Sequence, residues 1–195
     1  MANKLYLDEQ TLLEDSFRLA AKVHRSGFRP SFIVAIWRGG APVGIAVQEL
    51  FAWKGVMADH IAIRTASYQD IDRQANVVKV YSLSYLVKKI AAEDNLLIVD
   101  DVFDTGRSVQ AVIDELARLT RRNMPRDVRI AVPYYKPERR QVARKPDYWL
   151  HETTQWIKFP HSLEGLDAEE VRTHRPALAA ILDQAGGGAN STDAS

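Results

Sequence analysis

The sequence predicts an α/β protein in which helices flank a parallel β-sheet. Three short apolar runs support this fold, at residues 32–36, 96–99 and 128–135. Continuous apolar runs of this length are typical of strands that are buried on both faces, as in a parallel sheet. Segments with helical character lie between the runs, and strands that alternate with helices indicate parallel pairing. A chain of 195 residues is long enough for one domain with a substantial core.

The composition excludes several classes of protein. The net charge is only +1, so no overall field would attract nucleic acid or a membrane surface. Cysteine is absent, which excludes disulfides, thiolate metal sites and cysteine nucleophiles. The N-terminus lacks the apolar core of a signal peptide, and no apolar run reaches the length of a membrane span. We therefore expect a soluble, cytoplasmic protein that binds neither nucleic acid nor a membrane.

A glycine turn follows the first apolar run. The predicted strand at residues 32–36 leads through Arg38, Gly39 and Gly40 into a predicted helix at residues 42–51, which has a proline in its first turn. Where a strand leads through glycines into a helix start, free backbone N–H groups and the helix dipole can bind an anion. The turn is therefore a candidate anion site.

The next part of the chain is less regular. Residues 56–64 are expected to form a strand, residues 77–83 another, and residues 84–92 a helical turn or two. Between the two strands, residues 65–76 are polar and have no clear period, so composition alone indicates a solvated loop. Segments of this kind also supply the lids that close over active sites.

The second apolar run ends in two adjacent carboxylates, Asp100 and Asp101. A turn with hydroxyl side chains follows, and Ser108 is placed to cap a helix over residues 109–122. The helix start can bind a phosphate, with Thr105 adding a hydroxyl donor. The carboxylates suit a different task, because they can accept hydrogen bonds from sugar hydroxyls or approach a hard cation. Together these features predict a site for a phosphorylated sugar.

The third apolar run ends at Lys136, at the edge of the sheet where ligands of α/β proteins bind. Arg38 and the carboxylate pair are predicted at the same edge, and this convergence is stronger evidence than any one motif. The basic run at residues 138–145 has no interleaved aromatic residues, so we interpret it as a solvated connection and not as a nucleic-acid site.

Residues 99–108, Val-Asp-Asp-Val-Phe-Asp-Thr-Gly-Arg-Ser, resemble the phosphoribosyl-pyrophosphate motif of the type I phosphoribosyltransferases. The motif is specific: apolar residues, two acidic residues, two apolar residues, and a small loop that ends in Thr or Ser. Arg107 departs from the pattern, since the family often has Gly or Lys there. The resemblance implies a type I phosphoribosyltransferase-like (Rossmann-like) fold with a small hood over the sheet.

Two further segments resemble the purine branch of that family. Arg38 and the two glycines resemble its pyrophosphate-binding loop, which implies that Arg38 and Gly39 contact pyrophosphate and that the Trp37–Arg38 peptide is cis. Ser67 and Tyr68 resemble the Ser-Tyr pair in the mobile catalytic loop of hypoxanthine-guanine phosphoribosyltransferases. The resemblance therefore favours a lid at residues 65–76.

The resemblance also implies a base-binding site. Lys136 matches the lysine that donates to the exocyclic oxygen of a 6-oxopurine. The hood is expected mainly at residues 146–165, where Trp156 would stack on the purine and the backbone of Ile157 would read its edge. Without the resemblance, a Trp beside an Ile is more simply interpreted as core packing.

The reaction that the resemblance implies is transfer of 5-phosphoribosyl from phosphoribosyl pyrophosphate to hypoxanthine, guanine or xanthine, in purine salvage. Asp104 would be the general base. Asp100 and Asp101 would hold the ribose hydroxyls and, directly or through water, Mg²⁺. The turn that would bind the 5′-phosphate consists of Thr105, Gly106, Arg107 and Ser108.

Relatives of this kind form homodimers or homotetramers, and we expect the same here. Two alternatives remain open at this point. One is a regulatory protein that binds phosphoribosyl pyrophosphate without turnover, and the other is an enzyme for a different base.

The remaining segments are peripheral. Apolar residues at helical spacing predict a helix over residues 8–26, and a short C-terminal helix is expected within residues 166–183. We expect one domain over residues 1–185, with N-terminal residues able to join the hood, and a flexible tail at residues 186–195, which has no apolar residues to bury.

Overall fold

Parallel strands form the centre of the protein, as the sequence predicts. The computed structural model describes residues 4–70 and 75–186. Its strands are β1 (Lys4–Tyr6), β2 (Phe32–Trp37), β3 (Asp59–Asp70), β4 (Ala75–Tyr81), β5 (Asn95–Val99), β6 (Val102–Phe103), β7 (Asp127–Tyr135), β8 (Tyr148–Glu152) and β9 (Trp156–Lys158). Its helices are α1 (Glu9–Arg25), α2 (Gly40–Trp53), α3 (Ser84–Lys89), α4 (Arg107–Thr120), α5 (Ala168–His174) and α6 (Pro176–Gln184), with 3₁₀ turns at Arg121–Asn123 and Pro137–Arg139. In these described residues, no helix is both long and apolar enough to cross a membrane.

The main sheet has seven strands in the order β4-β3-β2-β5-β7-β6, with β8 also paired to β7. Every pairing in it is parallel except that of β3 with β4. The registers place Val34 opposite Ile98 and Ile98 opposite Ile130. All three side chains are fully buried, which explains why these strands read as continuous apolar runs.

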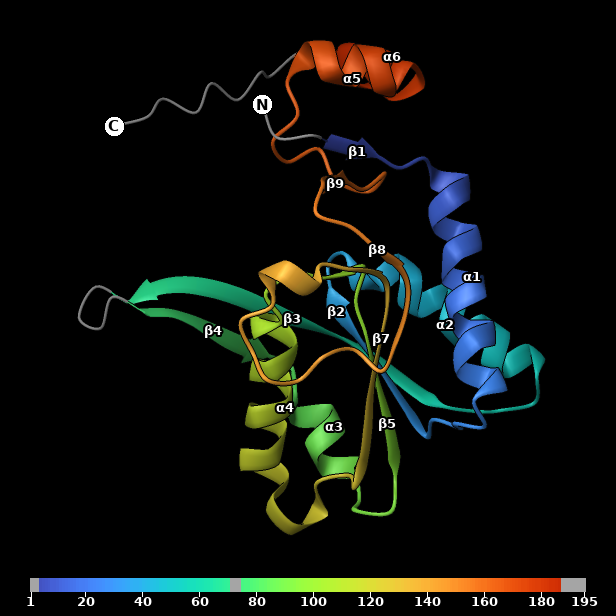
Figure 1. The fold of residues 1–195 in the computed structure, drawn as a ribbon, viewed down its shortest axis with the longest axis vertical. Helices are drawn as coiled ribbons and strands as arrows, with labels where there is room; N and C mark the ends of the chain where they lie inside the picture. The colour runs from blue at the N-terminus through green and yellow to red at the C-terminus, as the bar shows by residue number, and fades with distance from the viewer. Residues whose placement is uncertain (1–3, 71–74, 187–195) are drawn as a thin grey trace.

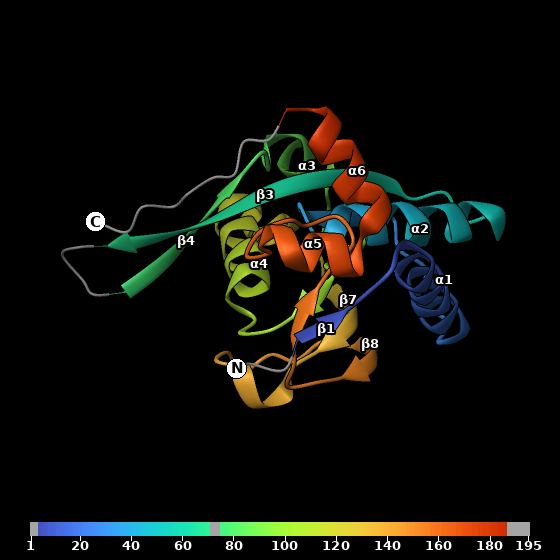
Figure 2. The same cartoon turned by 90° about the horizontal axis from the view of Figure 1, so that it is seen from above.

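Helices cover both faces of the sheet, with α1 and α2 on one side and α3 and α4 on the other (Figures 1 and 2). Successive side chains of β5 point to opposite faces of the sheet and pack against the two helical layers in turn. Leu97 and Val99 belong to the core beneath α1 and α2, whereas Leu96 and Ile98 belong to the core beneath α3 and α4. The carboxyl end of β5 therefore emerges between two well-packed layers, which hold it rigidly.

The described parts of the segment at residues 65–76, residues 65–70 and 75–76, are in strands and not in the irregular loop that the composition indicates. Strand β3 continues to Asp70 and β4 begins at Ala75, and the two pair in antiparallel register from Arg64 opposite Tyr81 onward. Pairing with a neighbouring strand supplies backbone hydrogen bonds that composition does not reveal, so the local signal was misleading. Residues 71–74 of the predicted lid lie outside the described residues.

The helix after the carboxylate pair also begins earlier than expected. Its N-cap is Gly106, and α4 starts at Arg107, so the prediction that Ser108 caps the helix is wrong. Gly106 has φ +79°, and a Cβ there would lie 2.5 Å from the Phe103 ring. Only glycine fits this left-handed position without strain, and it lets the turn pack directly on the core.

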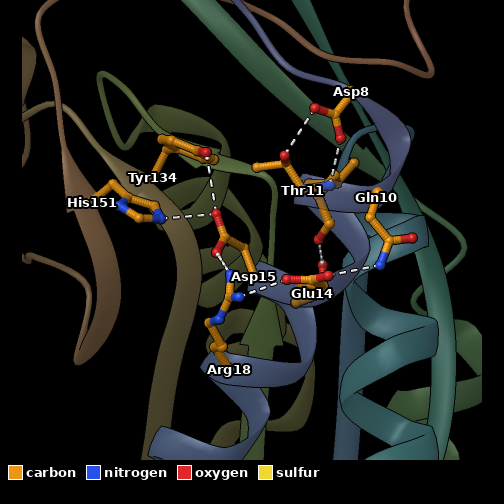
Figure 3. Close-up of polar contacts among 10 residues, drawn as sticks. Asp8, Gln10, Thr11, Glu14, Asp15, Arg18, Tyr134 and His151 are labelled. Carbon is orange, nitrogen blue, oxygen red and sulfur yellow. Dashed lines mark hydrogen bonds and ion pairs between the residues drawn. The ribbon is translucent and has the colours of Figure 1, made fainter.

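A buried carboxylate ties α1 to the sheet (Figure 3). Asp15 accepts a hydrogen bond from the Tyr134 hydroxyl at 3.3 Å, and His151 Nε2 lies 2.8 Å from the same oxygen. Arg18 donates to the other oxygen at 2.8 Å. Burial raises the pKa of Tyr134 above its usual value, and the Asp15 charge raises it further. The cluster fixes α1 against β7 and β8, and β8, which was expected in the hood, pairs with β7 in the main sheet.

Strands β1 and β9 form a separate parallel pair beyond the carboxyl ends of the main sheet, beneath α5 and α6 (Figure 1). The N-terminal strand thus joins the hood. Both Lys4 and the Tyr6 hydroxyl donate to Glu170 of α5, the hydroxyl at 2.6 Å. The Tyr6 and His174 rings stack at 3.6 Å. The expected single C-terminal helix is instead two short helices, which meet at Arg175.

The contact between β1 and α5 is expected to weaken in acid. Hydrogen bonds from Lys4 and Tyr6 lower the pKa of Glu170 to about 2 from 4.5. A lowered folded-state pKa stabilises the fold above the unfolded-state pKa, and this stability is lost as the pH falls from about 4.5 toward 2. In thermal unfolding, the midpoint difference between wild type and Glu170→Gln should shrink over that range. A constant difference would mean that the Glu170 charge does not hold α5.

Candidate active site

A cavity of about 440 Å³ opens where the hood faces the carboxyl ends of the central strands. Its volume lies within the range of small-molecule sites. Among the residues that line it are seven of the predicted site residues, namely Arg38, Gly39, Asp101, Asp104, Lys136, Trp156 and Ile157. The structure thus brings together β9 and the segments that follow β2, β5, β6 and β7, which are far apart in the chain.

The glycine turn after β2 packs directly on the carboxylate pair after β5. A Cβ on Gly39 would lie 2.0 Å from Asp101 Oδ2, and one on Gly40 would lie 2.6 Å from the Val99 carbonyl oxygen. A larger residue at Gly39 would displace the Asp101 side chain, whereas one at Gly40 would collide with the backbone at Val99 and Asp100. The Gly40 N–H also donates to the Asp100 carboxylate. The two predicted motifs are therefore one structural unit, in which glycines allow a backbone to approach acidic side chains.

Electrostatics at this contact favour a ligand that carries positive charge or hydrogen-bond donors. Burial raises the pKa of Asp100 well above its usual value, and the neighbouring Asp101 carboxylate raises it further. Two adjacent carboxylates resist being charged together because their charges repel. Hydroxyl donors or a cation would relieve this repulsion.

Asp104 lies between two cations. Lys136 Nζ donates a hydrogen bond to Oδ2 of this carboxylate at 3.2 Å. Arg139 Nε lies 2.7 Å from Oδ1, which is close enough for an ion pair, but the two groups are not aligned as a hydrogen bond. Lys136 is almost fully buried, at 4% exposed, and its ammonium also lies 5.4 Å from the centre of the Trp156 ring. A carboxylate, a buried ammonium and an aromatic face therefore lie in sequence along the cavity.

Trp156 is 49% exposed, so it is not the core residue that a Trp beside an Ile would suggest. Its ring has a second ammonium nearby, Lys158 Nζ at 5.8 Å. Ile157, between them on β9, points into the core under α1 and α2. The alternation of the strand thus leaves the indole available to a planar ligand.

The turn from Thr105 to Ser108 adjoins the cavity without lining it. Within the described residues, the backbone N–H of Arg107 has only a weak contact, at 3.4 Å to the Thr105 hydroxyl. Arg107 itself is exposed, so its side chain does not fill the turn. The backbone of Thr105 is held in place, since its carbonyl accepts a hydrogen bond from the backbone N–H of Gln141 at 3.0 Å. The N-terminus of α4 remains open to an anion.

The Trp37–Arg38 peptide is cis, as the resemblance implied. The Arg38 side chain pairs with Glu164 at 2.7 Å, and both side chains are exposed. Glu164 also lines the cavity. A ligand anion at Arg38 would have to compete with this carboxylate.

Among the residues that sequence reasoning missed, His161 and Arg139 contact carboxylates of the predicted site. His161 Nε2 lies 3.3 Å from Asp101 Oδ2, and no motif in the sequence indicates this contact. Arg139 belongs to the basic run that we interpreted as a solvated connection; its side chain is exposed, but it also pairs with Asp104. The one signal for Arg139 is the turn that begins at Pro137, because it bends the chain back so that the Arg139 N–H bonds the Lys136 carbonyl.

Ser67 and Tyr68 lie on β3, with Val78 and Val77 of β4 as their pairing partners. Their backbone is therefore in a paired strand and not in an irregular loop. Their predicted role in closing the site stays a prediction.

The donor set bears on whether the site could hold a metal ion. No group of three or more His, Asp or Glu side chains in the described residues converges in a way that could hold a metal. Mg²⁺ needs only one or two protein carboxylates when a phosphorylated substrate and water supply the other ligands. Asp100 and Asp101 fit that need.

The sequence profile of the phosphoribosyl transferase domain matches residues 3–168. The chain belongs to the phosphoribosyl transferase family. The matched segment includes β2, β5 and β7, both loops that meet at Asp101, and the hood strand that carries Trp156. A phosphoribosyltransferase binds phosphoribosyl pyrophosphate and a base, and the cavity lies at the edge of the sheet where such ligands are expected. No curated protein sequence matches the chain.

Solved phosphoribosyltransferase structures share its fold. A purine phosphoribosyltransferase from Pyrococcus horikoshii is 22% identical with a TM-score of 0.67, over 85% of this chain and 97% of that one. The xanthine-guanine-hypoxanthine phosphoribosyltransferase of Helicobacter pylori is 24% identical with a TM-score of 0.63, over 80% of this chain and 92% of that one. A hypothetical protein from Neisseria gonorrhoeae with bound ppGpp is 19% identical with a TM-score of 0.68, over 93% of this chain and 98% of that one.

Proposed function

We propose that this phosphoribosyltransferase transfers the 5-phosphoribosyl group of phosphoribosyl pyrophosphate to a 6-oxopurine. The observation that carries the proposal is that Asp104, Lys136 and Trp156 lie next to one another along one cavity. A 6-oxopurine has a ring nitrogen that loses a proton, an exocyclic oxygen that accepts a hydrogen bond, and a flat face. The three side chains supply one partner for each of these features.

In this proposal the base nitrogen attacks the anomeric carbon of the sugar as the bond to pyrophosphate breaks. Asp104 accepts the proton that the nitrogen loses, while Lys136 donates to the exocyclic oxygen. Trp156 holds the ring plane. The products are a purine nucleoside monophosphate and pyrophosphate, so every bond and proton is accounted for. Proton transfer of this kind contributes about 10²–10⁴-fold to rate.

The sugar donor would be held from the opposite side. Asp100 and Asp101 would accept hydrogen bonds from the ribose hydroxyls, and their charge would favour the positive charge that develops on the sugar as the glycosidic bond breaks. The open N-terminus of α4 would bind the 5′-phosphate through residues 105–108. Arg38 would bind the pyrophosphate once Glu164 releases it.

Mg²⁺ would be held at Asp100 and Asp101, directly or through water, together with the substrate. It would supply neutralisation of charge on the departing pyrophosphate. Dimeric or tetrameric assembly, expected from the resemblance, belongs to the same proposal.

The test of the function is pyrophosphate release from phosphoribosyl pyrophosphate and Mg²⁺, with hypoxanthine, guanine, xanthine, adenine and uracil supplied one at a time. The proposal expects release with at least one of the first three bases and little with the last two. Release with adenine or uracil alone would overturn the choice of a 6-oxopurine. Binding of the sugar donor without release for any base would favour the regulatory protein.

Replacing Trp156 with alanine should weaken purine binding more than binding of the sugar donor. Stacking on an aromatic side chain is worth about 1–3 kcal/mol per base, or roughly 5- to 150-fold in affinity. The measurement is the KM for each substrate in steady-state kinetics. Trp53→Ala is the matched control, because Trp53 is 85% exposed on α2. Equal losses for both substrates in Trp156→Ala would argue against stacking.

A further inference from the structure

Two buried cations hold the loop at residues 158–165, which closes one side of the active site. Arg175 is 9% exposed, and its guanidinium donates to four backbone carbonyls, those of Phe159 at 2.6 Å, Ser162 at 2.8 Å, and Lys158 and Pro160 at 3.4 Å each. Lys158 Nζ donates to the carbonyls of Glu164 at 3.0 Å and Gly165 at 2.8 Å. In residues 4–70 and 75–186, neither cation forms an ion pair with a carboxylate.

The carbonyls that Arg175 binds continue directly from the strand that carries the base-binding residues. Lys158 is the last residue of β9, two positions after Trp156. Farther along the same loop, His161 reaches Asp101 and Glu164 reaches Arg38. A planar guanidinium has five donors in a fixed arrangement, so one side chain can set the path of several successive peptides. The position of β9 relative to the cavity therefore depends on Arg175.

Arg175 lies outside the part of the chain that the family profile matches, which ends at residue 168. It joins α5 to α6, and α5 is itself tied to β1 through Glu170 and through the stacked rings of Tyr6 and His174. Because β1 pairs with β9, the C-terminal helices are connected to both strands of the hood. By contrast, no hydrogen bond or ion pair links Arg175 to the phosphate turn at residues 105–108, within the residues that the structure describes.

We infer that Arg175 is a positioning residue for the purine base, and that α5 and α6 are part of the base-binding half of the active site. The inference rests on the proposed function, because it assigns the base to the surface of Trp156. Loss of the guanidinium leaves several buried carbonyls without a donor and frees the loop to shift. A shift of this kind moves the indole and the backbone beside it, whereas the carboxylate pair and the phosphate turn stay in place on the main sheet.

The test is Arg175→Lys, which keeps the charge but cannot reproduce the planar set of donors. The KM for the base should rise about tenfold or more, because small displacements of substrate-positioning groups have large kinetic effects. The Kd for phosphoribosyl pyrophosphate, measured by calorimetry with Mg²⁺ and no base, should stay within about twofold of wild type, since its predicted contacts are elsewhere. Arg172→Lys is the control, because Arg172 is exposed on α5 and should leave both values unchanged.

A merely structural role would give a different result. It would lower the melting temperature and the active fraction, with the KM for the base unchanged, and that outcome would overturn the inference. An equal loss of both substrates would overturn it as well. If Arg175→Lys does not fold, His174→Ala replaces it, because that change loosens α5 from Tyr6 without emptying a buried site. A selective rise in the base KM is again expected, and an unchanged KM would contradict us.

Failure of the proposed function would be visible separately. If the wild-type enzyme releases no pyrophosphate with any base, the function is wrong, and the Arg175 variants are then compared by binding of inosine monophosphate and of ribose 5-phosphate. Weaker binding of the nucleotide alone would still support the positioning role. Equal binding of both ligands in wild type and variant would refute it.

Discussion

Replacing Asp104 with asparagine is expected to lower turnover about 10²–10⁴-fold, because the group that accepts the proton from the attacking nitrogen is lost. The amide has the same shape and can still accept a hydrogen bond from Lys136, which lies 3.2 Å from the carboxylate. The fold and the position of the base should therefore be preserved. The measurements are kcat with saturating substrates and the Kd for phosphoribosyl pyrophosphate. We expect the first to fall and the second to stay within about twofold.

The matched control is Asp114→Asn, on α4 and outside the cavity. It removes one negative charge from the same part of the protein, so it reports any general effect of charge. A turnover within about threefold of wild type in Asp104→Asn would remove Asp104 from the role of base. A second distinction comes from Lys136→Gln, which should raise the KM for the base, because it removes the donor to the exocyclic oxygen.

The central strands could be predicted because burial on both faces leaves an unmistakable pattern. β2, β5 and β7 lie between two helical layers, so most positions in them favour an apolar residue. The long hairpin of β3 and β4 could not be predicted in the same way. Its stability depends on cross-strand pairs such as Thr65 with Val80, and pairing of this kind is decided by the partner strand and not by the local sequence.

The candidate site shows the same division. The strand end, turn and helix start around Asp100 could be predicted from the spacing itself, and the resemblance to a contiguous family motif implies a role for Asp104. His161 could not be predicted, since its relevance comes from a 3.3 Å approach to Asp101 across a long separation in sequence. Arg175 was missed because it binds backbone carbonyls. Every residue has a backbone carbonyl, so the sequence contains no motif that would indicate such a contact.

The contact between the two loops predicts a large effect from the smallest possible substitution. In Gly39→Ala, the new Cβ would lie 2.0 Å from Asp101 Oδ2, so this carboxylate must rotate away. The obstructing atoms belong to a side chain, and the backbone of the loop need not move. We therefore expect a folded protein with a melting temperature near that of wild type. Its kcat/KM for phosphoribosyl pyrophosphate should fall at least about tenfold, because a carboxylate that holds the ribose is displaced.

A double-mutant cycle identifies the cause. If Gly39→Ala acts by displacing Asp101, adding it to Asp101→Ala should cost little more than Asp101→Ala alone, since both remove the same interaction. Independent effects that multiply would show that Gly39 matters for another reason, such as a direct contact of its N–H with pyrophosphate. The cycle thus tests whether close approach of a backbone to a carboxylate, and not the identity of either loop alone, creates the sugar site.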